Sequence, residues 1–151
     1  MAGDKMSELL RGPRYRIWQN RAGTSAIEFA FVAPLFLMFF FGMTAYGIYF
    51  GASHSVQQIA ADAARTAIAG LGEAERSALA ADFINRNAGG YPFVDPHNIV
   101  AHTYGSADDD NQFVVAIRYD ARTLPIWNLL DGLPLPGMTI TRQSTIRIGG
   151  I

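Results

Sequence analysis

The longest run of apolar residues lies near the start of the sequence, from Phe29 to Phe50. About 22 residues there carry no charge, and a helix of that length would extend roughly 33 Å, enough to cross a hydrocarbon core of ~30 Å. A single segment in lipid must be a helix, because one strand cannot satisfy its backbone hydrogen bonds there. We therefore predict one transmembrane helix over residues 24–51.

The helical pattern continues beyond this run. Over residues 52–70, apolar residues recur at three- and four-residue spacing with polar residues between them, which predicts an amphipathic continuation of the same helix. A second helix is expected over residues 73–88. Glu73 and Glu75 favour its positive end, and Gly89 follows its last turn.

Residues 98–149 have the pattern of strands. Apolar and polar residues alternate over residues 113–119 and again over residues 139–148, and residues 98–104 are rich in β-favouring types. We expect about three antiparallel strands packed on the long helix, which makes the fold class α+β. The apolar segment 124–136, which contains Trp127, is either a lid over the edge of the core or a contact surface for a partner.

Composition narrows the function. The 151 residues include no cysteine, which excludes disulfides and thiolate metal sites, and the net charge of −1 gives no reason to expect nucleic-acid binding. Charge is unevenly distributed, because residues 1–23 include five basic residues and only two acidic ones: Lys5, Arg11, Arg14, Arg16, Arg21, Asp4 and Glu8. The positive-inside rule then predicts a cytoplasmic N-terminus and an exported domain over residues 52–151.

A single carboxylate, Glu28, stands at the edge of the apolar run. A cleaved secretory signal does not fit well, because its apolar region is shorter and a small-residue cleavage site follows it. A plain signal anchor explains the length and the basic flank but has no use for Glu28, which costs free energy near lipid unless it is paired or interfacial. A third interpretation is needed for this residue.

The residues around Glu28 form a recognisable motif. Arg21 and Gly23 are followed by a run of small and apolar residues with one glutamate, and then by a proline: Thr24, Ala26, Ile27, Glu28, Phe29, Ala30 and Pro34. The motif resembles the class III signal of type IV prepilins. In detail it is similar to the TadE/TadG family of pseudopilins from the tight-adherence (Tad, or Flp) pilus system. The resemblance covers roughly residues 16–55.

This resemblance implies a fold, a processing step and a role. A prepilin peptidase would cut between Gly23 and Thr24, leaving residues 1–23 as a basic cytoplasmic leader. Ala26, Ile27, Glu28, Phe29 and Pro34 would serve recognition and assembly, with Glu28 pairing with the freed amine of a neighbouring subunit. The implied protein is a pilin-like minor pseudopilin of the bacterial inner membrane and, in part, of the surface pilus. Its implied partners are other Tad pseudopilins, the assembly platform and membrane lipid.

The implied role is to initiate, cap or regulate pilus assembly, and hence to support adhesion, biofilm formation or secretion. The alternative is an unprocessed, signal-anchored envelope protein that binds a partner through its exported domain. Within the helix, Pro34 is expected to produce a kink. Gly47 and Gly51 form a GxxxG pair, which is either a weak packing face or a chance occurrence.

Catalytic motifs are missing from the sequence. The three histidines, His54, His97 and His102, have neither the spacing nor the cysteine partners of a transition-metal site. The run from Asp108 to Asn111 is either a calcium ligand group or a solvated turn, and it lacks the glycine and terminal glutamate of an EF-hand loop. We therefore expect no enzyme activity, no metal, no cofactor and no small-molecule substrate.

Overall fold

The structure is a computed structural model of the chain, and it describes residues 21–106, 109, 111–129, 134 and 136–148. Of the leader predicted over residues 1–23, residues 1–20 lie outside these described residues. By its contacts the chain divides into two units, residues 1–39 and residues 40–151. Of the first unit, only the beginning of helix α1 is described. Helix α1 runs from Arg21 to Ala67 and continues through Pro34 as helix, so the kink expected there stays a prediction.

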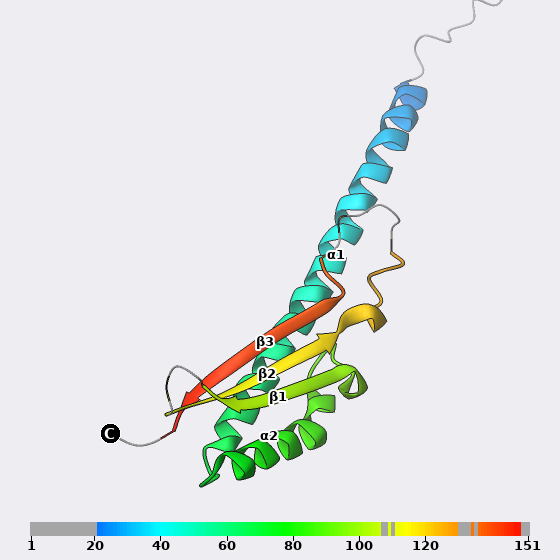
Figure 1. The fold of residues 1–151 in the computed structure, drawn as a ribbon. Helices are drawn as coiled ribbons and strands as arrows, with labels where there is room; N and C mark the ends of the chain where they lie inside the picture. The colour runs from blue at the N-terminus through cyan, green and yellow to red at the C-terminus, as the bar shows by residue number, and fades with distance from the viewer. Residues whose placement is uncertain (1–20, 107–108, 110, 130–133, 135, 149–151) are drawn as a thin grey trace, which may run out of the picture. The chain divides into compact units, whose positions relative to one another are not determined.

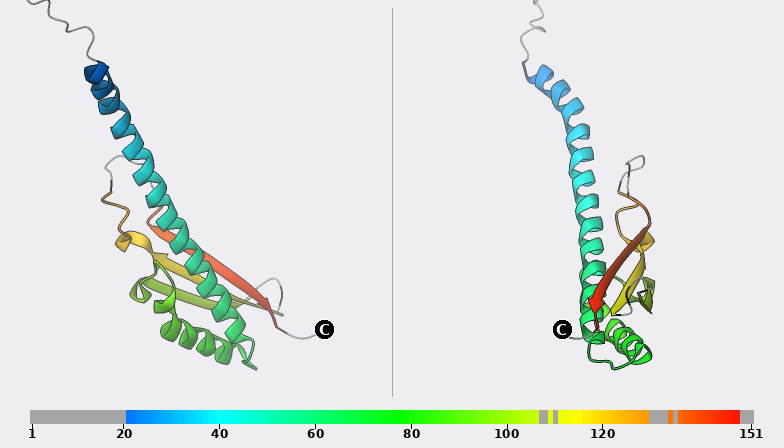
Figure 2. Two further views of the ribbon diagram at one scale, coloured as in Figure 1. Left: turned by 180° about the vertical axis from the view of Figure 1, so that it is seen from behind. Right: turned by 60° about the vertical axis from the view of Figure 1, so that its left-hand side comes forward.

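The second unit contains the rest of α1, a second helix and one sheet. Helix α2 spans Glu73–Asn87, and the strands are β1 (Ile99–Gly105), β2 (Gln112–Asp120) and β3 (Thr139–Arg147). The strands pair in the order β1-β2-β3, and both pairings are antiparallel. Figure 1 shows the strands side by side. The part of α1 in this unit and α2 cover the same side of the sheet, as the view from behind in Figure 2 also shows. The predicted α+β fold is confirmed.

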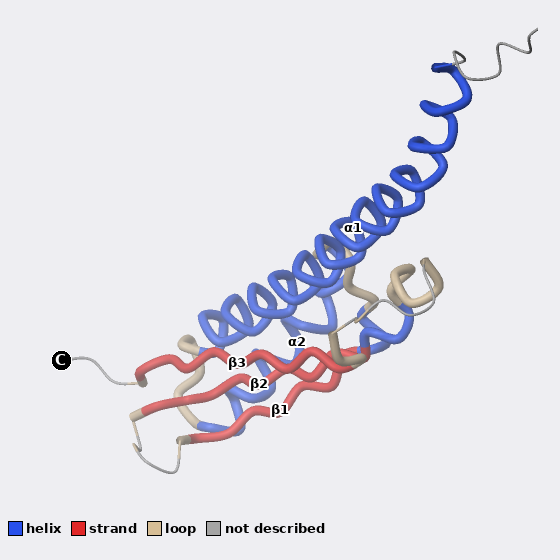
Figure 3. The backbone as a smooth tube through the Cα atoms, turned by 90° about the horizontal axis from the view of Figure 1, so that it is seen from above, coloured by secondary structure: helices blue, strands red, loops and turns tan. Residues whose placement is uncertain are grey.

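Alternate side chains of β2 form one half of the core. Phe113, Val115, Ile117 and Tyr119 are all buried and face the helices, as the two-residue period requires. The other half comes from α1, which supplies Val56 and Ile59 together with a stripe of fully buried alanines: Ala52, Ala60, Ala63, Ala64 and Ala67. The part of α1 that carries these side chains lies along the sheet, as seen from above in Figure 3.

The turn between α1 and α2 is tight. Gly70 is buried, and a Cβ added there would lie 2.8 Å from the backbone nitrogen of Arg76 in the first turn of α2. The carboxylate of Glu75 accepts a hydrogen bond from the Leu71 amide at 2.8 Å, which satisfies a backbone donor in this turn. Glu73 in turn accepts from the amide of Gly105 at 3.1 Å. The start of α2 is therefore tied to the end of β1.

The hairpin loop between β1 and β2 contains the residues considered for calcium. Asp108 and Asp110 lie outside the described residues. The carboxylate of Asp109 accepts from the Asn111 amide at 2.9 Å and from the Gln112 side-chain amide at 3.0 Å. Asp109 thus acts as a turn-stabilising group here.

The apolar segment 124–136 begins as a lid. Leu124 and Ile126 are buried in the core, and the indole nitrogen of Trp127 donates to the carbonyl of Ala121 at 2.7 Å. The lid interpretation therefore holds for residues 124–127. Residues 130–133 and 135 are outside the described part. Farther along, the carbonyl oxygen of Pro134 accepts a hydrogen bond from the Tyr46 hydroxyl of α1.

Candidate processing and assembly motif

The motif that resembles a prepilin signal occupies the first turns of α1. Gly23, Thr24 and Glu28 are exposed, and no atom lies within 4 Å of a Cβ placed on Gly23. Ala26, Ile27 and Phe29 between and beside them are exposed as well. The bond between Gly23 and Thr24 lies in the first turn, where the amide groups have no partner within the helix and the backbone opens most easily. The residues on both sides of this bond are therefore exposed at the start of the helix.

Glu28 makes no hydrogen bond or ion pair with any other residue that the structure describes, apart from those of the helix backbone. Its neighbours along the helix are apolar and exposed: Ile27, Phe29, Phe31, Val32, Leu35 and Phe36. A lone carboxylate on such a surface favours a cationic partner or an interface with water when the surface enters lipid.

The exposed part of α1 is apolar enough to cross a membrane. Residues Gly23–Ala67 include a window of mean hydropathy 2.0 of which 0% is buried. A soluble protein would leave these side chains in water at a cost of about 25 cal/mol for each Å² of apolar surface.

The first fully buried residue in the described part of α1 is Ala45, whose exposure is 0%. Met43, two residues earlier, is 76% exposed, and the Tyr46 hydroxyl one residue later is bonded to Pro134. Farther along, Ser53 and Ser55 are buried too, and Ser53 accepts a hydrogen bond from Arg142 of β3 at 2.5 Å. The cover therefore starts inside the range 24–51 that the sequence predicts to span the membrane.

The two glycines of the GxxxG pair have different surroundings. No atom lies within 4 Å of a Cβ placed on Gly47, whereas a Cβ on Gly51 would lie 2.9 Å from two ring carbons of Phe93. An aromatic ring of the same chain therefore occupies the space that a side chain at position 51 would take. Sequence reasoning missed Phe93, and the only local signal was its position directly after Pro92 in a turn-rich segment.

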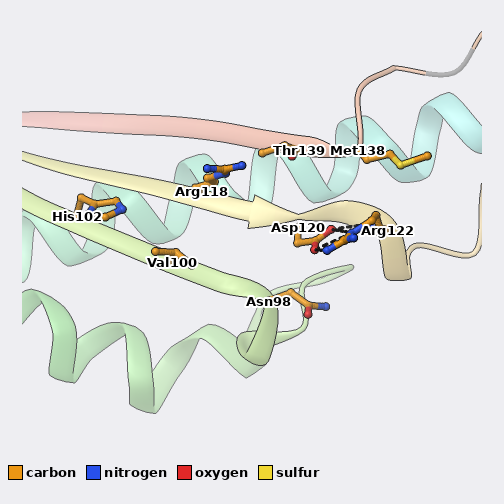
Figure 4. A pocket seen from close by; sticks show the side chains of 8 residues that line it. All are labelled: Asn98, Val100, His102, Arg118, Asp120, Arg122, Met138 and Thr139. Atoms are coloured by element: carbon orange, nitrogen blue, oxygen red, sulfur yellow. Dashed lines mark hydrogen bonds and ion pairs between the residues drawn. The ribbon is translucent and has the colours of Figure 1, made fainter.

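The outer face of the sheet carries a hollow of about 530 Å³. Figure 4 shows the side chains that line it, from all three strands and the turns beside them: Asn98, Val100, His102, Arg118, Asp120, Arg122, Met138 and Thr139. The guanidinium of Arg122 donates to both carboxylate oxygens of Asp120 at 2.5–2.9 Å. Hydrogen bonding to Arg122 lowers the pKa of Asp120 to about 2, so this pair stays ionised at neutral pH.

A second polar link joins α1 to the turn after α2. The hydroxyl of Tyr91 donates to Asp62 at 2.8 Å, and Arg65 donates to the other oxygen of the same carboxylate at 2.6 Å. Burial, followed by the hydrogen bond and the charge of Asp62, raises the pKa of Tyr91 to about 12. The link is structural. Among the described residues, no group of three or more histidine, aspartate or glutamate side chains is placed to hold a metal ion.

These observations define an α+β protein with a candidate transmembrane helix whose N-terminal part is apolar and exposed. Residues 23–65 match the family model of "TadE-like protein", so this segment is similar to TadE-like proteins. The match begins at Gly23 and ends within the amphipathic part of α1, so the resemblance drawn from the Gly23–Glu28 motif is confirmed. No curated protein and no solved structure matches this chain.

Proposed function

We propose that this protein is a minor pseudopilin that takes part in assembly of a Tad (Flp) pilus, by initiating, capping or regulating it. Its cellular outcome is then adhesion, biofilm formation or secretion. The observation that carries the proposal is the TadE-like match, which starts at Gly23 and covers the exposed apolar helix. The role is one of assembly, with protein partners from the pilus system and no catalytic step.

Maturation is part of the proposal. A prepilin peptidase cuts between Gly23 and Thr24 and removes the leader, residues 1–23. The mature chain then consists of a membrane segment within residues 24–51 and an exported domain over residues 52–151. The exposed position of the bond in the first turn of α1 and the basic flank before it support this order of events.

Glu28 has a specific task in this scheme. Cleavage frees an α-amino group at Thr24, whose ordinary pKa near 8 leaves it mostly protonated at pH 7. In the assembly, this amine of one subunit pairs with Glu28 of its neighbour and removes the cost of two separate charges near lipid. A buried ion pair of this kind favours one register between subunits. The absence of any partner for Glu28 within the described chain is consistent with an intersubunit role.

The first test is the N-terminus of the membrane-extracted protein, determined by intact mass in strains with and without the peptidase. We expect a chain that begins at Thr24 only where the peptidase is present. Gly23→Val should block cleavage, and Thr24→Ser, on the other side of the same bond, should not. A chain that retains residues 1–23 in both strains would refute the processing step and favour the signal-anchored envelope protein.

The second test separates assembly from anchoring. Glu28→Gln should leave the protein in the membrane and abolish or strongly reduce surface pili. Asp82→Asn is the matched control, because it removes the same charge from an exposed pair with Arg86 on α2 that contributes little to stability. Equal pilus yield from both variants would contradict the proposed role of Glu28.

A further inference from the structure

Four aromatic residues gather where the folded unit begins to cover α1. Tyr46, Tyr49 and Phe50 lie within two turns of the helix, and the ring centroids of both tyrosines are 6.1 Å from that of Phe50. Phe93 from the turn before β1 packs its ring on Gly51. We call these four residues the aromatic collar. Phe50 is 63% exposed and Phe93 is 52% exposed, so the collar presents apolar rings outward.

Phe93 occupies this position at a conformational cost. Its φ of 60° lies in the left-handed region, and it is the one non-glycine residue with positive φ in the described part of the chain. For an aromatic side chain this backbone conformation is strained. The backbone is held there by the buried hydroxyl of Tyr119, which accepts from the Asp95 amide at 3.3 Å and donates to the Phe93 carbonyl at 3.4 Å. About half of the surface of Phe93 remains exposed, so burial within the chain does not explain the strain.

The position of the aromatic collar along α1 indicates which layer of the membrane surrounds it. Glu28 belongs at the edge of the hydrocarbon core, and a helix that enters the core at Phe29 reaches about 30 Å, the thickness of that core, near Tyr49. Residues 46–51 then lie within about 5 Å of this far edge of the core, on either side of it. A headgroup layer adds roughly 5–8 Å on each side of the core. Tyrosines with an apolar ring and a polar hydroxyl are enriched in this layer.

We propose that the aromatic collar seats the exported unit on the lipid headgroup layer of the bilayer that α1 spans. Tyr46 keeps its hydroxyl bonded to Pro134, while the rings of Phe50 and Phe93 enter the boundary between headgroups and acyl chains. The collar thereby sets how far α1 is inserted. The inference rests on the membrane-spanning part of the proposed function and is independent of the peptidase.

Depth measurements on the full chain test the seating. The chain has no cysteine, so single cysteines can carry a fluorescent label in vesicles of phosphatidylethanolamine and phosphatidylglycerol. The label at Pro92→Cys, which is exposed and leaves Phe93 in place, should be quenched by phospholipids brominated near the headgroup. The label at Leu71→Cys, which is 92% exposed beyond the far end of α1, should be quenched only from water.

The outcomes of these labelling experiments distinguish failure of the seating from failure of the membrane span. Adding Phe93→Ser to Pro92→Cys should lower lipid quenching at least twofold, whereas Phe93→Leu should retain most of it. Equal quenching at positions 92 and 71, or no effect of Phe93→Ser, would overturn the seating. A label at Met43→Cys reports on the span itself. If lipid does not quench that label either, α1 does not cross the bilayer, and both the seating and the membrane part of the proposed function fail.

Discussion

Gly70 is the position where a single methyl group has the largest predicted effect on the folded unit. A Cβ there would lie 2.8 Å from the nitrogen, 2.9 Å from Cγ and 3.1 Å from Cα of Arg76. Two of these three atoms belong to the backbone of the first turn of α2, so a change of rotamer cannot remove the conflict. Reaching an ordinary separation near 3.5 Å requires the turn to open by about 0.7 Å.

Opening this turn disturbs several contacts together. The Arg76 amide bonds to the Gly72 carbonyl at 2.9 Å, and Glu73 holds the end of β1 through Gly105. Overpacking of this kind costs about 1–3 kcal/mol, and the loss of glycine's freedom in the unfolded chain returns about 0.4–1 kcal/mol. We expect Gly70→Ala to lower the free energy of unfolding by about 1–2 kcal/mol. For a unit of this size the melting temperature should fall by about 5–15 °C.

Gly90→Ala is the matched control for this prediction. No atom lies within 4 Å of a Cβ at that position, so the same chemical change should leave the melting temperature unchanged or raise it slightly. Both variants of the full chain can be melted in detergent micelles and followed by near-ultraviolet circular dichroism, which reports aromatic packing in the core. Equal melting temperatures for the two variants would refute the argument that Gly70 is required by the approach of α2.

Three further predictions concern single contacts. Folding raises the pKa of Tyr91 from 10.0 to about 12, so the contribution of Tyr91 to stability is complete below pH 10 and is lost as the pH rises towards 12. In the variant Asp62→Asn, NMR titration should give a lower pKa for Tyr91. An unchanged pKa would contradict the hydrogen bond between Tyr91 and Asp62. Arg122→Ala should raise the pKa of Asp120 from about 2 towards its ordinary 3.8, as measured by NMR titration of the carboxyl carbon; a pKa that stays near 2 would show that Arg122 is not the cause. Gly72→Ser should raise the melting temperature slightly, because the N-cap of α2 has no side-chain hydrogen bond; a decrease would show that the added hydroxyl does not cap the helix.

Patterns that repeat over a short stretch could be predicted from the sequence. The apolar run, the helical spacing after it and the alternation over residues 113–119 each reflect a local period, and one buried face follows from each period. The Gly23–Glu28 motif is likewise contiguous, so its resemblance to TadE-like proteins can be recognised from the order of its residues alone, and the family match confirms it. These features depend on neighbours in the chain.

Contacts between distant residues could not be predicted in this way. The sequence alone extends the apolar run to Phe50, whereas the fold covers α1 from Ala45 and joins Tyr46 to Pro134, 88 residues away. Gly51 has the spacing of a helix-packing motif, yet the ring that packs against it belongs to Phe93, which lies in a turn 42 residues later in the same chain. No periodicity relates such pairs, because their proximity arises only when the sheet and both helices are assembled. The sequence determined which segment is apolar enough for a membrane, and the tertiary structure decided where along that segment the folded unit begins.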